Sequence, residues 1–301
     1  MAPTQEPRAT NQWSNHNRAP DASRNPEGRG TGATPGNGAF KAMSTGWFDM
    51  TTVAVFVRPP ESGTVLSNCV DAGAVTSGEA TDLYRALTRD VCAAVEASGG
   101  DLLVNYRPVN RTDPTSTEDD PSARAAVESV VEDALEAPDA ARYEVQVGST
   151  FSARVGNTIT HLLEREDVKS AAMLRPTAGL IERRHLDSAA MKLRQSAVVL
   201  GPATDGLVSF AAFAEPIDFE DAFVTPEIET LAARATDAGH DVDLVEMLPV
   251  ADSTGGLATL VSQIRARQRA GLWVPQYTSA VVDDLGLRAE TVDDRLTIGR
   301  N

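Results

Sequence analysis

Lysine is scarce in this chain of 301 residues. Only Lys41, Lys169 and Lys192 occur, so 24 of the 27 basic residues are arginines. Acidic side chains number 43, which leaves a formal net charge of −16. Such a charge opposes nucleic-acid binding, which needs a basic patch. An acidic, lysine-poor surface favours solubility at molar salt, where the Debye length is about 3 Å. We therefore expect a halophilic protein; an arginine-biased genome is the alternative.

Cysteine and long apolar runs are scarce as well. Cys69 and Cys92 have no metal-ligand spacing, and Cys92 lies on an apolar helical face, as a buried free thiol does. No apolar run approaches the roughly 20 residues of a membrane helix. The N-terminus has no apolar core like that of a secretion signal. The sequence thus predicts a cytoplasmic protein without a membrane span.

Several common catalytic signatures are missing. No Gly-Lys-Ser/Thr follows the first expected strand, so the chain has no P-loop there. No Gly-x-Ser-x-Gly elbow or Ser-His-Asp order occurs, so no hydrolase signature is found. His161, His185 and His240 are scattered and form no His-x-x-x-His pair, which is typical of surface or packing residues.

Composition divides the chain into three parts. Residues 1–49 are rich in Asn, Pro, Gly, Ser, Thr and Arg without an apolar period, which predicts a disordered tail. Residues 50–270 alternate strand and helix patterns, which predicts an α/β domain: three layers, with a mostly parallel sheet and helices on both faces. Residues 271–301 are expected to hold a helix near 275–285 and a polar tail.

The expected elements follow from periodicity and capping signals. Thr76-Ser-Gly-Glu79 is a capping box and Gly99-Gly100 a stop signal. Thr225-Pro226-Glu227 predicts a helix with a threonine cap and proline in the first turn. The expected strands are 52–57, 101–106, 142–147, 170–174, 197–200, 207–214 and 243–247. The other expected helices are 76–98, 122–136, 149–165, 181–194 and 256–270.

One turn stands out as a candidate binding site. The buried run from Val198 ends in Gly201-Pro202, and Asp205-Gly206 follows before the next apolar run. Asp252 follows a later expected strand, and ligands of such sheets bind beyond the carboxyl ends of strands. Asp205 and Asp252 are therefore candidate ligands of Mg²⁺ or Mn²⁺. Alternatively, Asp205 serves the turn and Asp252 caps a helix.

The loop after the first strand is a candidate phosphate cradle. It comprises Arg58-Pro-Pro-Glu-Ser62-Gly63, in which backbone N–H groups around Ser62 and Gly63 can face an anion. Arg58 is the only cation in this loop. The alternative is an ordinary strand-to-helix connection.

Taken in order, these motifs carry a family resemblance. They are the strand-one loop, Tyr84-Arg-Ala-Leu87, Gln146-Val-Gly148 with Ala153-Arg154 and Asn157, Leu200-Gly-Pro-Ala-Thr-Asp-Gly206, Thr225-Pro-Glu227 and Asp252. Over roughly residues 52–268 the chain resembles the glycosyltransferase-A-like family known as domain of unknown function 2064, a relative of nucleotide-sugar transferases and nucleotidyltransferases. The resemblance implies a glycosyltransferase-A or Rossmann-like fold. It also implies a nucleotide or nucleotide sugar held with Mg²⁺ or Mn²⁺.

The chain departs from the family pattern at two points. The family's basic run after the strand-one glycine is replaced by Leu66, Ser67 and Asn68. The family's metal-binding aspartate after the fourth strand is replaced by Thr177, beside Arg175. In the implied site, Asp205 and Asp252 would hold the metal. The implied contacts to phosphate or nucleotide are Arg58, Ser62, Gly63, Arg175, Thr177 and Gly206.

These losses and retentions favour different functions. The missing basic run and aspartate favour a nucleotide- or nucleotide-sugar-binding protein with a degenerate metal and phosphate site. The retained Asp205-Gly206 turn and Asp252 favour an active, divalent-metal-dependent glycosyl- or nucleotidyltransferase. A non-catalytic interaction subunit is the third alternative. The sugar, base, acceptor and oligomeric state do not follow from the sequence.

Overall fold

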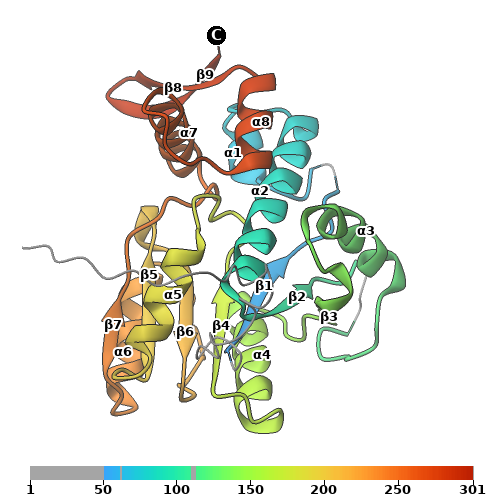
Figure 1. Cartoon of the computed structure of the whole chain (residues 1–301), viewed down its shortest axis with the longest axis vertical. Coiled ribbons are helices and arrows are strands. Elements are labelled where there is room, and N and C mark those ends of the chain that lie inside the picture. The colour runs from blue at the N-terminus through green and yellow to red at the C-terminus, as the bar shows by residue number, and fades with distance from the viewer. Residues whose placement is uncertain (1–50, 62, 110–112, 301) are drawn as a thin grey trace, which may run out of the picture. The chain divides into compact units, whose positions relative to one another are not determined.

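The computed structural model describes residues 51–61, 63–109 and 113–300, and the predicted disordered tail lies outside this part. A seven-stranded sheet forms its centre (Figure 1). The strands are β1 (Thr51–Val57), β2 (Asp101–Tyr106), β3 (Arg142–Val145), β4 (Ser170–Leu174), β5 (Val198–Pro202), β6 (Val208–Phe213) and β7 (Val242–Leu244).

The sheet is mostly parallel, as predicted. The strand order is β3-β2-β1-β4-β6-β5-β7, and only β6 runs antiparallel to its neighbours, β4 and β5. The turn that contains Asp205 and Gly206 joins β5 directly to β6. A parallel connection needs a crossover of a dozen or more residues, so this short turn forces the two strands to be antiparallel.

Helices cover both faces of the sheet, which confirms the predicted three-layer α/β class. Because strand side chains alternate, β1 contributes Val53, Val55 and Val57 to one core and Ala54 and Phe56 to the other. Helices α2, α3, α5 and α7 supply the first core, and α4 and α6 supply the second. The helices are α1 (Ser67–Asp71), α2 (Ser77–Ser98), α3 (Pro121–Val131), α4 (Phe151–Arg165), α5 (Arg183–Lys192), α6 (Glu227–Asp237), α7 (Thr254–Arg269) and α8 (Gln276–Asp284).

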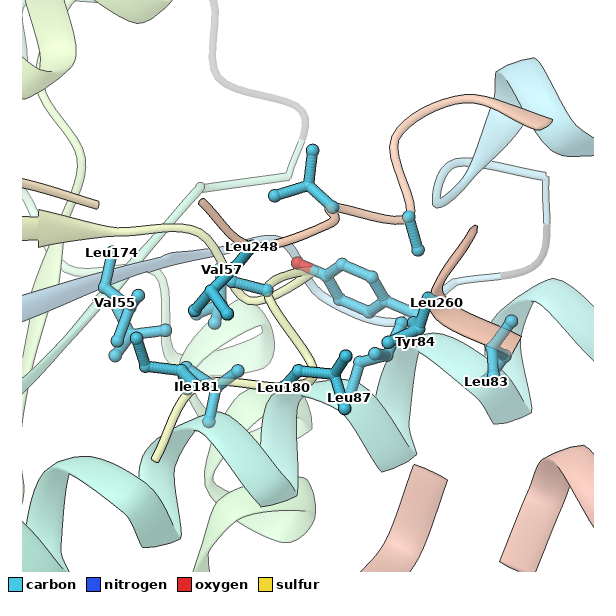
Figure 2. Close-up of a cluster of buried hydrophobic side chains, with 14 of the residues drawn as sticks. Val55, Val57, Leu83, Tyr84, Leu87, Leu174, Leu180, Ile181, Leu248 and Leu260 are labelled. Atoms are coloured by element: carbon cyan, nitrogen blue, oxygen red, sulfur yellow. The ribbon is translucent and has the colours of Figure 1, made fainter. Parts of the chain in front are cut away.

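The first core anchors the loop that follows β1. Figure 2 shows Val55 and Val57 of β1 with Tyr84 and Leu87 of α2 in one buried cluster. The backbone N–H of Arg58 donates to the Tyr84 hydroxyl at 2.9 Å. The packing of α2 therefore sets the direction in which the chain leaves the sheet.

Local capping signals set the ends of α2. Thr76 Oγ1 accepts from the N–H of Glu79 at 3.3 Å, while Glu79 Oε2 accepts from the N–H of Thr76 at 2.7 Å. Gly99 ends the helix in the left-handed region, with φ of 80°. The predicted capping box and stop signal are both confirmed.

Two expectations for the chain's second half were wrong. Thr225 does not cap α6: extended Pro226 occupies the cap position without a side-chain hydrogen bond, so the helix begins at Glu227. The expected polar tail is instead an antiparallel pair, β8 (Leu287–Val292) and β9 (Arg295–Arg300). Asp293 and Asp294 both have positive φ, the geometry of a tight hairpin turn. Buried Leu287 and Ile298 fix the hairpin to the first core.

Two further predictions concern the cysteines and membrane-spanning helices. Both cysteines are buried free thiols, as predicted for Cys92. Within the described ranges, no helix has the length and apolar character needed to cross a membrane.

His185 of α5 provides a prediction on pH dependence. Its Nδ1 accepts from the N–H of Glu182 at 2.9 Å, and burial, reinforced by Arg184, lowers the pKa of His185 below 6.5. The neutral ring thus stabilises the fold above pH 6.5, and this stabilisation is lost as the pH falls through the lowered pKa. We expect the melting temperature of the wild type to fall more steeply on acidification than that of His185→Asn. Equal falls in melting temperature on acidification for the two proteins would contradict this.

Candidate functional site

A cleft of about 560 Å³ opens at the carboxyl edge of the sheet. Its walls come from the segments after β1, β3, β4 and β5, and from the loop that precedes α7. Five of the predicted site residues line it: Arg58, Arg175, Thr177, Asp205 and Asp252. The strand order thus brings together side chains that lie far apart in the sequence.

The two predicted glycines do not line this cleft. Gly63 is exposed with φ of 82°, and a Cβ there would meet no atom within 4 Å. Gly206 has φ of 72°, and a Cβ would contact Pro226 at 3.3 Å. Both glycines permit left-handed turns, and their predicted contacts with a ligand stay predictions. Ser62 lies outside the described residues.

Arg175 is held by the protein through all of its nitrogens. Nη2 donates to Glu227 Oε1 at 2.5 Å, Nη1 donates to Asp252 Oδ2 at 3.2 Å, and Nε donates to the carbonyl of Val208 at 2.8 Å. The guanidinium also lies 4.9 Å from the centre of the Phe151 ring.

Glu227 explains why Arg175 is held in this way. Its side chain is only 4% exposed, and its Oε2 accepts from the N–H of Val208 at 3.0 Å. A buried carboxylate needs a counter-ion, and Arg175 provides it. Arg175 thus uses three of its five N–H donors on these protein groups, and its predicted contact with a phosphate stays a prediction.

The predicted divalent-metal site does not fit the side chains present. Asp252 is paired with Arg175 at 3.2 Å, and Asp205 accepts a hydrogen bond from the hydroxyl of Ser253. Thr177, at the position of the family's carboxylate, is buried, and its hydroxyl has no hydrogen-bond partner. Within the part of the chain that the structure describes, no three His, Cys, Asp or Glu side chains are placed to hold a metal. A guanidinium beside Asp252 also repels a second cation.

An arginine cluster, consisting of Arg58, Arg107 and Arg154, lies at the same edge of the sheet. Arg154 is only 7% exposed, and its Nε has no hydrogen-bond partner. Burial, with repulsion from Arg107 and Arg58, lowers the pKa of Arg154 to about 10. Burial and Arg58 likewise lower the pKa of Arg107. Among the described residues, none of the three forms an ion pair with a carboxylate, so this acidic protein holds unbalanced positive charge here.

Arg107 was missed by the sequence reasoning, although a signal for it existed. Val57 of β1 is directly paired with Tyr106 of β2, so Arg58 and Arg107 both follow the last pair of this ladder. Arg154 comes from the first turn of α4, just after β3. Gln146 ties these ends together, because its Nε2 donates to the carbonyls of Val57 and Asn105. Listing the residue after each expected strand would have found Arg107.

Comparisons with known proteins identify the fold. No family model and no curated protein matched the sequence, so domain of unknown function 2064 in particular gains no support. The chain is similar to the structure of a candidate nucleotide-diphospho-sugar transferase from Desulfovibrio desulfuricans G20. That match has 16% identity and a TM-score of 0.62, and covers 78% of this chain and 94% of the other.

A second match is CMP:2-keto-3-deoxy-manno-octonic acid synthetase complexed with CTP. It has 12% identity and a TM-score of 0.40, and covers 74% of this chain and 99% of the synthetase. The identities are low, so the first match supports a common architecture and no particular activity. The chain therefore has an α/β fold, with a seven-stranded and mostly parallel sheet, similar to that of the candidate nucleotide-diphospho-sugar transferase.

Proposed function

We propose that the cleft binds a nucleotide or a nucleotide sugar, whose phosphates contact Arg58 and Arg154 without a bridging metal ion. The observation that carries this proposal is the arginine cluster, which lies without a carboxylate partner among the described residues at the carboxyl edge of β1 and β2. Arginine's planar fork of donors suits phosphate oxygens, and α/β sheets bind ligands at this edge.

The size of the cleft supports a ligand of this class. At about 560 Å³ it falls within the range of roughly 300–1,000 Å³ that is common for small-molecule sites. Four aromatic side chains line it together with Arg58 and Arg154, so apolar and cationic contacts are both available: Phe56, Tyr84, Phe151 and Phe223. The fold supports the same class, since the structural match is described as a candidate nucleotide-diphospho-sugar transferase.

The metal-free form of the proposal rests on Arg175. Its guanidinium pairs with both Asp252 and Glu227, so Asp252 is not a free carboxylate for a metal ion, and the cluster supplies the positive charge for phosphates. In this proposal the chain is a divergent member of the resembled family, and its arginine side chains supply the positive charge that a metal ion would otherwise supply. An active transferase would also need to stabilise charge on the leaving diphosphate, and in this proposal that role would fall to Arg58 and Arg154.

A ligand panel tests this proposal. The melting temperature of the full chain is measured with nucleoside diphosphates and nucleotide sugars, with and without Mn²⁺. A ligand at about 100 times its Kd stabilises by about 2.7 kcal/mol. We expect stabilisation that does not depend on metal, that Arg58→Gln reduces, and that the matched control Arg183→Gln retains, since Arg183 is an exposed residue of α5.

Two outcomes would contradict the proposal. Stabilisation that requires Mn²⁺ and disappears in Asp205→Asn would favour the metal-dependent transferase instead. No stabilisation by any nucleotide would leave the non-catalytic interaction subunit as the better explanation.

A further inference from the structure

A side pocket of about 210 Å³ lies next to the cleft. It is lined by Arg107, Gln146, Gly148, Ser149 and Arg154, together with two prolines. Arg154 and Gln146 line the cleft as well, so the two spaces share these residues as a common wall. Among the residues that the structure describes, none of the site residues predicted from the sequence lines this pocket.

Close packing of the backbone at Gly148 shapes one wall of the side pocket. Gly148 has φ of 136°, and a Cβ there would lie 2.8 Å from the backbone N of Arg154. Its own N–H donates to the carbonyl of Pro114 at 2.8 Å, which ties the segment to the loop that precedes α3. Any other residue at position 148 would collide with the first turn of α4. The absence of a side chain at Gly148 thus lets this segment pack directly on that turn, where Arg154 lies.

The side chain of Arg154, which lines this pocket, has few hydrogen-bond partners. The Nε of Arg154 is buried and forms no hydrogen bond, and the one bond of its Nη1, to the carbonyl of Ser149, is 3.3 Å long. Arg107 adds a second positive charge nearby. Buried charge without a counter-ion is costly, so an anion in this pocket would relieve both desolvation and repulsion.

We propose that the side pocket is a phosphoryl-binding site, with the anion held between Arg107 and Arg154. A doubly charged phosphoryl group can balance both arginines, whereas a carboxylate balances only one. Its tetrahedral oxygens can accept from both guanidinium forks. The pocket is too small for a whole nucleotide, which the cleft accommodates.

Two kinds of molecule could supply this phosphoryl group. One is free inorganic phosphate, and the other is a ligand in the cleft whose terminal phosphate enters the side pocket. The second source follows from the position of Arg154, which faces both spaces. That source rests on the proposed nucleotide function, and the first does not.

Titration of the full chain with orthophosphate tests the proposal. Binding is followed by calorimetry and by the ¹⁵N–H signal of the Arg154 Nε, which is expected to shift on saturation. Arg107→Gln should weaken orthophosphate about tenfold or more, the effect of losing a charge-assisted hydrogen bond. Arg58→Gln, which changes the cleft alone, should weaken it less, and Arg183→Gln should leave it unchanged. If Arg107→Gln does not fold, Arg107→Lys keeps the charge without the fork and is expected to bind with reduced affinity.

Competition with a nucleoside diphosphate separates the sources. Mutual exclusion that Arg107→Gln removes assigns the phosphoryl group to the cleft ligand, and simultaneous binding assigns it to free phosphate. The proposal is overturned if orthophosphate does not bind, or if Arg58→Gln weakens it as much as Arg107→Gln does. If orthophosphate binds and no nucleotide does, the nucleotide function fails while this site stands.

Discussion

Replacing Arg175 with methionine is expected to destabilise the fold by about 3–5 kcal/mol, the usual effect of removing one partner of a buried ion pair. Methionine keeps much of the apolar stem but leaves Glu227, whose side chain is 4% exposed, without its counter-ion. It also removes the donor to the carbonyl of Val208. Both losses act at the junction of β4, β6 and α6.

Denaturant unfolding at neutral pH measures this effect. The double variant Arg175→Met with Glu227→Gln should recover a large share of the loss, because a neutral amide needs no counter-ion and can still accept from the N–H of Val208. The control Arg183→Met changes an exposed pair with Asp187 and should stay within about 0.5 kcal/mol of the wild type. If Arg175→Met is no less stable than this control, the buried pair does not have the role assigned to it.

Replacing Arg154 with methionine is expected to have two effects of opposite sign. Affinity for the phosphate-containing ligand should fall about tenfold to a hundredfold or more, as expected for lost charge-assisted hydrogen bonds. The ligand-free protein should become more stable. Its Arg154 is 7% exposed, has an unpaired Nε and is repelled by Arg107 and Arg58, so removing its charge relieves an unfavourable interaction.

Calorimetry with the best ligand of the panel and melting curves without ligand measure these two effects. A residue that exchanges stability for binding has the signature of a functional group. Arg175→Met serves as the comparison, since it should lose stability outright. If Arg154→Met destabilises the ligand-free protein as strongly as Arg175→Met does, Arg154 is structural and the proposed ligand contacts lose their support.

Charge pairing decides which arginines remain available for a ligand, and it cannot be inferred from residue type. Arg175 was predicted to contact a phosphate, and the fold pairs its guanidinium with Glu227 and Asp252. Arg107 was not considered, although it shares the unbalanced cluster with Arg154. The distinction depends on which carboxylates the fold brings within reach of each guanidinium group.

The features that the sequence determined by itself depend on residues close together in the chain. The capping box of Thr76 and Glu79, the stop at Gly99 and the alternation of strands with helices follow from backbone geometry and apolar spacing over a few residues. That alternation was enough to predict the three-layer α/β class and to place Asp205 and Asp252 at one edge of the sheet.

What only the tertiary structure decided is non-local. The neighbours of β6, the docking of the β8–β9 hairpin and the counter-ion of Glu227 depend on contacts between segments that are distant in the chain. The hairpin shows why: its sequence is polar, and only the burial of Leu287 and Ile298 against the first core fixes it as strands. The free energies of burial and of charge pairing are set by the surroundings of a side chain, and those surroundings exist only once the sheet has formed.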